Sequence, residues 1–113
     1  MTYTESNESD ADIIDSGTCG SSLTWTLTNE GVLTVSGSGA MDNYTYDAGA
    51  VDTPWWGEIQ NIVRVEIESG VTTIGDLALY GCDSLETVTI LGDVGTIGDY
   101  AFYDCDSLET VTI

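Results

Sequence analysis

The chain has 113 residues, with 20 Asp and Glu residues, one Lys or Arg, no His and a formal net charge of −19. This length corresponds to one domain. Nucleic acids and anionic membrane surfaces bind through Lys and Arg side chains, so the composition argues against both as partners. The acidic excess suggests a solvated acidic surface, solubility in salt, a cationic partner or bound divalent cations.

Residues 1–16 are polar and acidic, and only Ile13 and Ile14 offer apolar side chains to bury. We expect a disordered acidic leader here, because such a segment cannot bury enough apolar surface to fold. We do not expect this segment to be a signal peptide, since it lacks a basic start and an apolar run. We expect no membrane insertion, because no stretch of the chain approaches the roughly 20 apolar residues of a membrane helix.

Residues 17–57 are expected to form a β-hairpin cap and a crossing loop. Apolar and polar residues alternate with period two on either side of Asn29, Glu30 and Gly31, which is typical of a hairpin with one apolar face. An isolated hairpin is only marginally stable, so we expect it to cover the open end of the repeats that follow it. Its predicted core is Leu23, Trp25, Leu27, Leu33 and Val35.

The crossing loop contains a pair of adjacent tryptophans, Trp55 and Trp56, directly after Pro54. Both rings could pack over the junction between cap and repeats. Adjacent residues of an extended chain point to opposite sides, however, so at least one ring could remain partly exposed. In that case the two tryptophans, with Tyr44 and Tyr46 nearby, would form an aromatic platform for a sugar ring or a peptide.

The second half of the chain contains a repeat. Residues 68–90 read ESGVTTIGDLALYGCDSLETVTI and residues 91–113 read LGDVGTIGDYAFYDCDSLETVTI, with sixteen of the twenty-three positions identical. A period of 20–30 residues is typical of a stacked solenoid, and the pattern LxxVxI is the strand signature of a leucine-rich repeat. We therefore predict leucine-rich repeats over residues 58–113, with parallel strands near 62–67, 85–90 and 108–113.

Each repeat should turn its apolar side chains inward. After the strand, a turn at Gly92 and Asp93 should lead into a short helical turn that Asp99 caps. The expected inward residues of one repeat are Leu85, Val88, Ile90, Val94, Ile97, Ala101, Phe102 and Cys105. One repeat cannot enclose this set, so stacking is required, and each large apolar side chain buried in this way contributes about 1.5–3 kcal/mol.

The outward face of the predicted strands is a candidate binding surface. It carries Arg64, Glu66, Thr87, Thr89, Thr110 and Thr112. A regular sheet presents a rigid row of side chains that suits protein recognition. Threonine is also favoured in strands for its propensity alone, so a plain solvated face remains the alternative.

Stacking should also align acidic residues and cysteines. Asp76 should lie above Asp99, and the pairs Asp83 with Asp106 and Glu86 with Glu109 should form similar columns. Unit charges about 5 Å apart in water repel by a little under ~1 kcal/mol, so added salt or Ca²⁺ should stabilise the stack.

Cys82 and Cys105 should stack as free thiols that fill the core, with Cys19 at the entrance to the cap. A disulfide between the stacked pair is conceivable by distance, but parallel side chains rarely have the required geometry.

Catalysis and metal binding find little support in the residue inventory. The chain has no His or Lys, one Arg and no CxxC spacing, so we expect no enzyme activity, no cofactor and no metal site.

The strings GVTTIGDLALYGCDSLETVTI and GTIGDYAFYDCDSLETVTI resemble the BspA-type leucine-rich repeats of bacterial surface proteins. The segment CGSSLTWTLTNEGVLTVSGSGAM, followed by PWW, is similar to the hairpin that often precedes such repeats. The resemblance implies a mainly β solenoid with short helical turns, made of an N-terminal hairpin cap and about two and a half repeats. Members of this family usually carry many more repeats.

The resemblance also implies a function. The expected role is a non-enzymatic recognition or adhesion module, secreted or on the cell surface, that binds an extracellular protein or glycan. The alternative is a passive spacer or a self-assembly module of a longer surface protein. An uncapped strand at Ile113 would permit an end-to-end homodimer.

Overall fold

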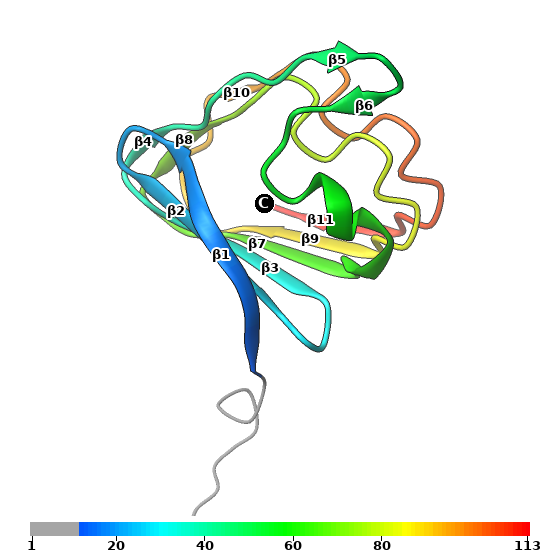
Figure 1. Ribbon diagram of the computed structural model, residues 1–113. Helices are drawn as coiled ribbons and strands as arrows, with labels where there is room; N and C mark the ends of the chain where they lie inside the picture. The colour runs from blue at the N-terminus through cyan, green and yellow to red at the C-terminus, as the bar shows by residue number, and fades with distance from the viewer. Residues whose placement is uncertain (1–11) are drawn as a thin grey trace, which may run out of the picture.

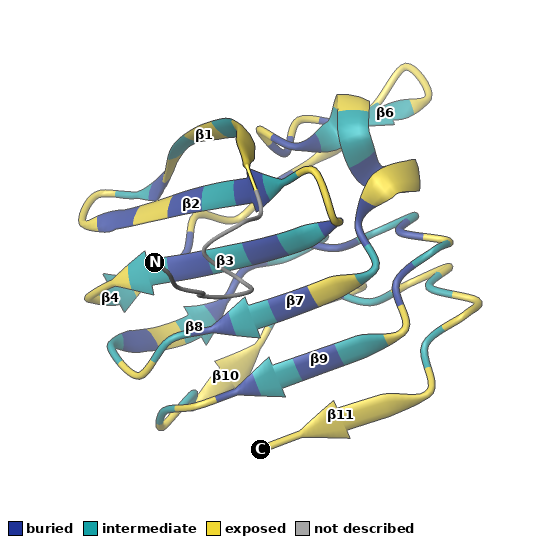
Figure 2. Cartoon of the chain, turned by 90° about the horizontal axis from the view of Figure 1, so that it is seen from below, coloured by how far each residue is buried: buried dark blue, intermediate teal, exposed yellow. Residues whose placement is uncertain are grey.

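The computed structural model describes residues 12–113, and its main feature is a six-stranded sheet. The order β1-β2-β3-β7-β9-β11 joins an antiparallel cap to a parallel stack, as Figure 2 shows. The strands are β1 (Ile13–Gly20), β2 (Leu23–Thr28), β3 (Val32–Gly37), β7 (Arg64–Ile67), β9 (Thr87–Ile90) and β11 (Thr110–Thr112). The predicted mainly β solenoid is confirmed.

A smaller parallel sheet forms the opposite wall of the solenoid. It consists of β10 (Thr96–Ile97), β8 (Val71–Ile74) and β4 (Gly39–Ala40), in that order. The repeats contribute one strand each to both sheets, and turn segments connect the sheets on the other side (Figure 1). A short hairpin of β5 (Tyr46–Asp47) and β6 (Ala50–Val51) lies beside these turn segments, and the 3-10 helix η2 (Trp56–Asn61) leads into β7. No helix within residues 12–113 is long and apolar enough to cross a membrane.

The hairpin continues the sheet of the repeats. β2 and β3 pair in antiparallel fashion, and β3 then pairs in parallel with β7, with Leu33 opposite Val65 and Val35 opposite Ile67. β3 therefore supplies the backbone partner that the first repeat strand would otherwise lack. The five predicted cap-core residues are all buried.

One boundary of the cap differs from the sequence prediction. Residues 13–16 were assigned to a disordered leader, but they form the first half of β1, which pairs with β2 from Ile13 to Gly20. The prediction was wrong for these residues because β1 is an edge strand whose side chains are mostly solvated, so its sequence lacks an apolar stripe. The rest of the predicted leader, residues 1–11, lies outside the described residues.

The core lies between the two sheets. Side chains from the repeat strands and from the second wall meet there, and those with no exposed surface include Ile62, Val65, Ile67, Ile74, Leu85 and Val88. The turn side of the solenoid closes this core with Ala78, Leu79, Cys82 and Ala101. At the centre, burial of side chains from successive repeats stabilises the stack, as the repeat pattern predicts.

The predicted helical turn after Asp99 is a series of tight turns instead. Backbone bonds run from Ala101 N–H to Gly98 and from Tyr103 N–H to Tyr100, each spanning three residues. Left-handed backbone at Tyr100 and Asp104 interrupts any helix, and Leu77 has the same conformation one repeat earlier. The apolar residues that were expected on one face of a helix are thus placed by consecutive tight turns.

Stacking brings the backbones of successive turns into close contact. A Cβ atom at Gly75 would overlap the carbonyl oxygen of Asp42, and one at Gly98 would overlap the backbone of Asp76. These equivalent positions therefore require glycine, which explains the IGD string in both repeats.

The last coil is covered on one side only. Ile97 and Val111 are each 45% exposed and Ile113 is 85% exposed, whereas their counterparts Ile74, Val88 and Ile90 are buried. The prediction that Ile97 points into a closed core was wrong for this coil, because no described segment packs on its outer side. Figure 2 shows the result as a fully exposed β11 beside the half-buried β9.

Candidate interaction surface

The outward side chains of the six-stranded sheet form a continuous polar surface, which we call the outer strand face. Strand pairing places Glu66 beside Thr89 and Thr89 beside Thr112, and it places Arg64 beside Thr87 and Thr87 beside Thr110. All six residues predicted for this surface are therefore neighbours on one face. The parallel pairing keeps equivalent residues of the repeats at the strand spacing of about 4.8 Å.

The hairpin extends this surface, which the sequence prediction did not foresee. Thr34 pairs with Glu66, Thr26 with Thr34, and Ser16 with Thr26, so one row of polar residues crosses all six strands. The alternation of Thr with apolar residues in β2 was a usable signal. What it could not reveal was that the hairpin joins the repeats edge to edge.

The chemistry of the outer strand face is dominated by hydroxyl groups. A threonine hydroxyl can both donate and accept a hydrogen bond, so a row of them can match many polar partners. Arg64 and Glu66 add one charge of each sign, with Nη1 of Arg64 3.9 Å from Oε2 of Glu66. Such an exposed ion pair contributes little to stability, so both groups are free to exchange this contact for one with a ligand.

Trp55 does not belong to any binding surface. Its ring is 1% exposed, and Nε1 donates a hydrogen bond of 2.8 Å to the carbonyl oxygen of Ala78. It also makes edge contacts with Trp25, at 5.5 Å between ring centroids, and with Tyr44, at 6.0 Å. The prediction of Trp55 as a binding residue was wrong, because this ring joins the core of the cap to the first repeat.

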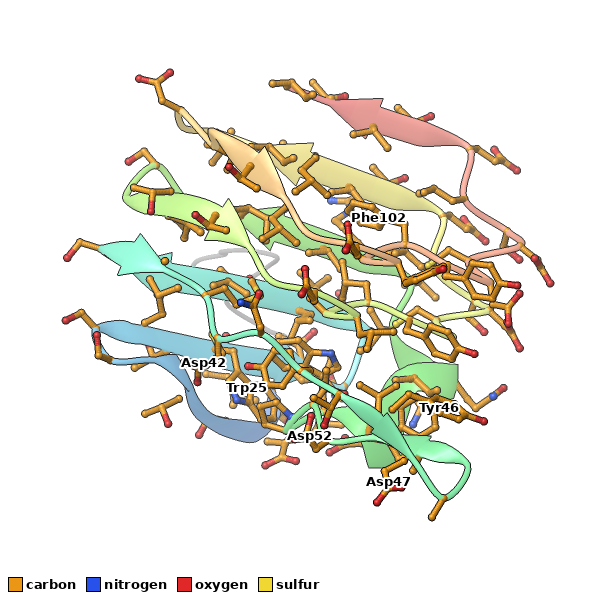
Figure 3. All side chains as sticks on the ribbon, turned by 90° about the horizontal axis from the view of Figure 1, so that it is seen from above. Trp25, Asp42, Tyr46, Asp47, Asp52 and Phe102 are labelled. Atoms are coloured by element: carbon orange, nitrogen blue, oxygen red, sulfur yellow. The ribbon has the colours of Figure 1, made fainter. Side chains whose placement is uncertain are left out.

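The other three aromatics of the loop differ in how far they are exposed. Trp56 is partly buried against the core, Tyr44 is buried, and Tyr46 is exposed on β5. A single platform of Trp55, Trp56, Tyr44 and Tyr46 is therefore not formed. Figure 3 shows Tyr46 out on the β5–β6 hairpin.

One predicted acidic column is held together by hydrogen bonds between successive coils. Oδ1 of Asp76 accepts the backbone N–H of Asp99 at 2.8 Å, and Oδ1 of Asn43 accepts the N–H of Asp76 at 2.9 Å. The carboxylate of Asp76 thus binds the backbone of the next coil, as the Asn43 amide binds that of Asp76, and this bond offsets the repulsion expected between the stacked Asp76 and Asp99 side chains.

The cysteines are free thiols packed in or near the core. Cys19 and Cys82 are buried and Cys105 is partly buried, with its Sγ donating to the carbonyl oxygen of Leu79 at 3.1 Å. Burial, together with the nearby charge of Asp42, raises the pKa of Cys19 to about 12. A hydrogen bond with Cys105 and burial also raise the pKa of Cys82. A protonated, buried thiol is a poor nucleophile, so both thiols fit the predicted role as core filler.

The described part of the chain, residues 12–113, has no cluster of metal ligands. No group of three or more His, Cys, Asp and Glu side chains within that range could hold a metal ion.

Comparisons with known proteins match the second half of the chain to one family and most of the chain to two solved structures. Residues 55–113 match the family model described as BspA type leucine rich repeat region. A leucine-rich repeat protein from Eubacterium ventriosum, known from a crystal structure, is similar with 38% identity and a TM-score of 0.76. A leucine rich cell surface protein from Faecalibacterium prausnitzii is similar with 24% identity and a TM-score of 0.48.

These two matches cover 87% and 88% of this chain, but only 26% and 30% of the respective relatives. The chain thus spans less than a third of the length of either one. A comparison with curated proteins found no match.

Proposed function

Because the chain belongs to the BspA-type leucine-rich repeat family, we propose that it is a non-enzymatic recognition module that binds an extracellular protein or glycan through its outer strand face. We propose further that it acts in adhesion, secreted or on the cell surface. The observation that carries the proposal is the in-register polar row from Ser16 through Glu66 to Thr112. A row of short side chains on a sheet loses little conformational freedom on binding, which favours affinity.

The buried side chains beneath this face also suit it to recognition. Its residues are supported from below by side chains with no exposed surface, such as Val65 and Val88, so the backbone beneath the polar row is rigid. A rigid scaffold that displays short polar side chains lowers the entropy lost when a partner binds.

The experiment is a binding screen of the purified chain against matrix glycoproteins and polysaccharides. The test variant is Thr89→Lys with Thr112→Lys, which places two long side chains on the outer strand face. The matched control is Thr72→Lys with Thr96→Lys, which makes the same change of charge at exposed threonines of the smaller sheet. We expect at least a tenfold loss of affinity in the first variant and little change in the second.

Equal losses in both variants would show a general charge effect and count against the outer strand face. Binding that survives in both variants would move the site elsewhere. An absence of binding by every protein in the screen would favour the second candidate function.

The second candidate is a structural module that assembles end to end. It is favoured by the exposed edge of β11 and by the exposed apolar side chains of Ile97, Val111 and Ile113. An open strand edge with apolar side chains can pair with another strand. We expect any such dimer to dissociate after Val111→Arg, which light scattering across a range of protein concentrations would detect. A monomer at all concentrations would eliminate this candidate.

A further inference from the structure

Four tyrosines form a continuous row on the turn side of the solenoid, away from the outer strand face. We call Tyr46, Tyr80, Tyr103 and Tyr100 the tyrosine ladder. Tyr46 meets Tyr80 edge to face at 5.6 Å between ring centroids, and Tyr80 stacks on Tyr103 at 5.4 Å with an interplanar angle of 19°. Tyr103 then meets Tyr100 edge to face at 5.5 Å. Each ring thus contacts the next.

The ladder is on the surface. Tyr46, Tyr103 and Tyr100 are 54%, 51% and 64% exposed, and Tyr80 is partly buried. Aromatic side chains bury 150–250 Å² in a protein core, and most of that gain is forgone here. Tyr100 also has a left-handed backbone with φ of 59°, which disfavours a bulky residue. Core stability therefore does not explain the tyrosines at these positions.

Repetition explains only the middle of the ladder. Tyr80 and Tyr103 occupy the same repeat position, so their stacking follows from the 23-residue period. Tyr46 comes from the β5–β6 hairpin, outside the repeats, and Tyr100 stands where the preceding repeat has Leu77. Two tyrosines of independent origin therefore extend the stacked pair at its two ends.

The surroundings of the ladder are acidic. Asp47 follows Tyr46 and Asp104 follows Tyr103, and both are exposed (Figure 3 shows Tyr46 with Asp47). Partial burial raises the pKa of Tyr80, and the neighbouring Tyr46 and Asp104 raise it further. The one basic residue of the chain, Arg64, lies on the other side of the solenoid in β7. Within the described residues, no Lys or Arg side chain therefore lies beside these rings.

We propose that the tyrosine ladder is a docking site for an extended basic segment of a partner protein, rich in Arg and Lys. Guanidinium and ammonium groups bind over the faces of aromatic rings, and carboxylates beside the rings add charge-assisted hydrogen bonds. A net charge of −19 would also attract such a segment from a distance. This site is separate from the outer strand face and does not depend on the function proposed for that face.

The test is a calorimetric titration of the full chain with an eight-residue peptide of alternating Arg and Ser, blocked at both ends. A peptide with Gln in place of each Arg is the neutral control. The ladder variant is Tyr46→Ser with Tyr100→Asn, which keeps the net charge, and Asn suits the left-handed backbone at position 100. The charge control is Glu30→Gln with Asp93→Asn, which removes two exposed acids and no tyrosine.

We expect the Arg peptide to bind and the Gln peptide not to bind. The ladder variant should weaken the binding of the Arg peptide about tenfold, because two cation–π contacts are lost, whereas the charge control should change it less than twofold. Tyr103→Phe, which keeps the ring face, should bind like the original chain. Added salt should weaken binding in each case.

Two results would overturn the proposal. The first is equal affinity of the original chain and the ladder variant for the Arg peptide, which would reduce the binding to general charge attraction. The second is loss of binding to a soluble glucan oligosaccharide in the ladder variant with no change toward the peptide, which would identify a glycan site. Should the double variant unfold, Tyr100→Asn alone provides the same comparison.

Discussion

The carboxylate of Asp76 accepts a hydrogen bond of 2.8 Å from the backbone N–H of Asp99, its counterpart one repeat later. Two acidic residues are thus held together by a bond between side chain and backbone, although their charges repel. The same arrangement links Asn43 of the crossing loop to Asp76. Gly75 and Gly98 of the two IGD strings allow close approach of the backbones, and Asp76 of the first string also binds the next coil.

Replacement of Asp76 tests the hydrogen bond between Asp76 and Asp99. Asp76→Ala should lower the free energy of unfolding by about 1 kcal/mol, the contribution of a hydrogen bond to a partly exposed carboxylate. Asp76→Asn keeps an acceptor oxygen and should lose less. Chemical denaturation provides the measurement. Asp83→Ala removes an exposed acid from the same repeat and should not destabilise the chain, so an equal loss there would refute the assigned role of the bond.

Replacement of Trp55 tests the link between cap and repeats. Trp55→Phe should destabilise the fold by about 1–3 kcal/mol, because the carbonyl oxygen of Ala78 loses its partner in a buried site. Trp56→Phe alters a partly exposed ring and should cost less. Thermal unfolding followed by circular dichroism compares the two. A larger effect at Trp56 would contradict the assignment of Trp55 as the central contact.

The acidic composition predicts that the stability of the fold depends on salt concentration. With 20 acidic residues and one basic residue, repulsion among carboxylates opposes the compact state at low ionic strength. The melting temperature should therefore rise as NaCl is increased from millimolar to molar concentration, because salt screens these charges. Differential scanning calorimetry gives the measurement, and an unchanged melting temperature over this range would rule out a significant repulsive contribution.

The contact between Glu58 and Asp15 predicts that the stability of the fold depends on pH. A hydrogen bond with Asp15, then partial burial and the charge of Asp15, raise the pKa of Glu58 above its ordinary value of 4.5. The folded state therefore holds this proton to higher pH than the unfolded state, so the contribution of the pair falls as pH rises through the folded pKa. Glu58→Gln should stabilise the chain at pH 7 and have little effect below the ordinary pKa.

The control for this pair is Glu30→Gln, which removes an exposed acid from the hairpin turn. It should produce a smaller gain in stability at pH 7, measured by denaturation at both pH values. A gain from Glu30→Gln as large as that from Glu58→Gln would indicate general charge relief and not the pair with Asp15.

The solenoid could be predicted from the sequence alone, because a period of 23 residues repeats both the strand pattern and the apolar positions. The hairpin and its core could be predicted too, since alternation along β2 and β3 is a local property that each strand displays alone. The outer strand face followed from the same alternation. Its six predicted residues are neighbours because parallel strands keep equivalent positions together.

Features that depend on contacts between distant segments could not be predicted from the local sequence. β1 and the second sheet have little local pattern, since β10 and β4 are two residues long and form only beside β8. Trp55 and Trp56 are adjacent and chemically alike, and Trp55 is the buried ring because it packs against Trp25, Tyr44 and Ala78. The tyrosine ladder likewise arises where a hairpin outside the repeats meets their turns, because the folded chain brings Tyr46 within reach of Tyr80.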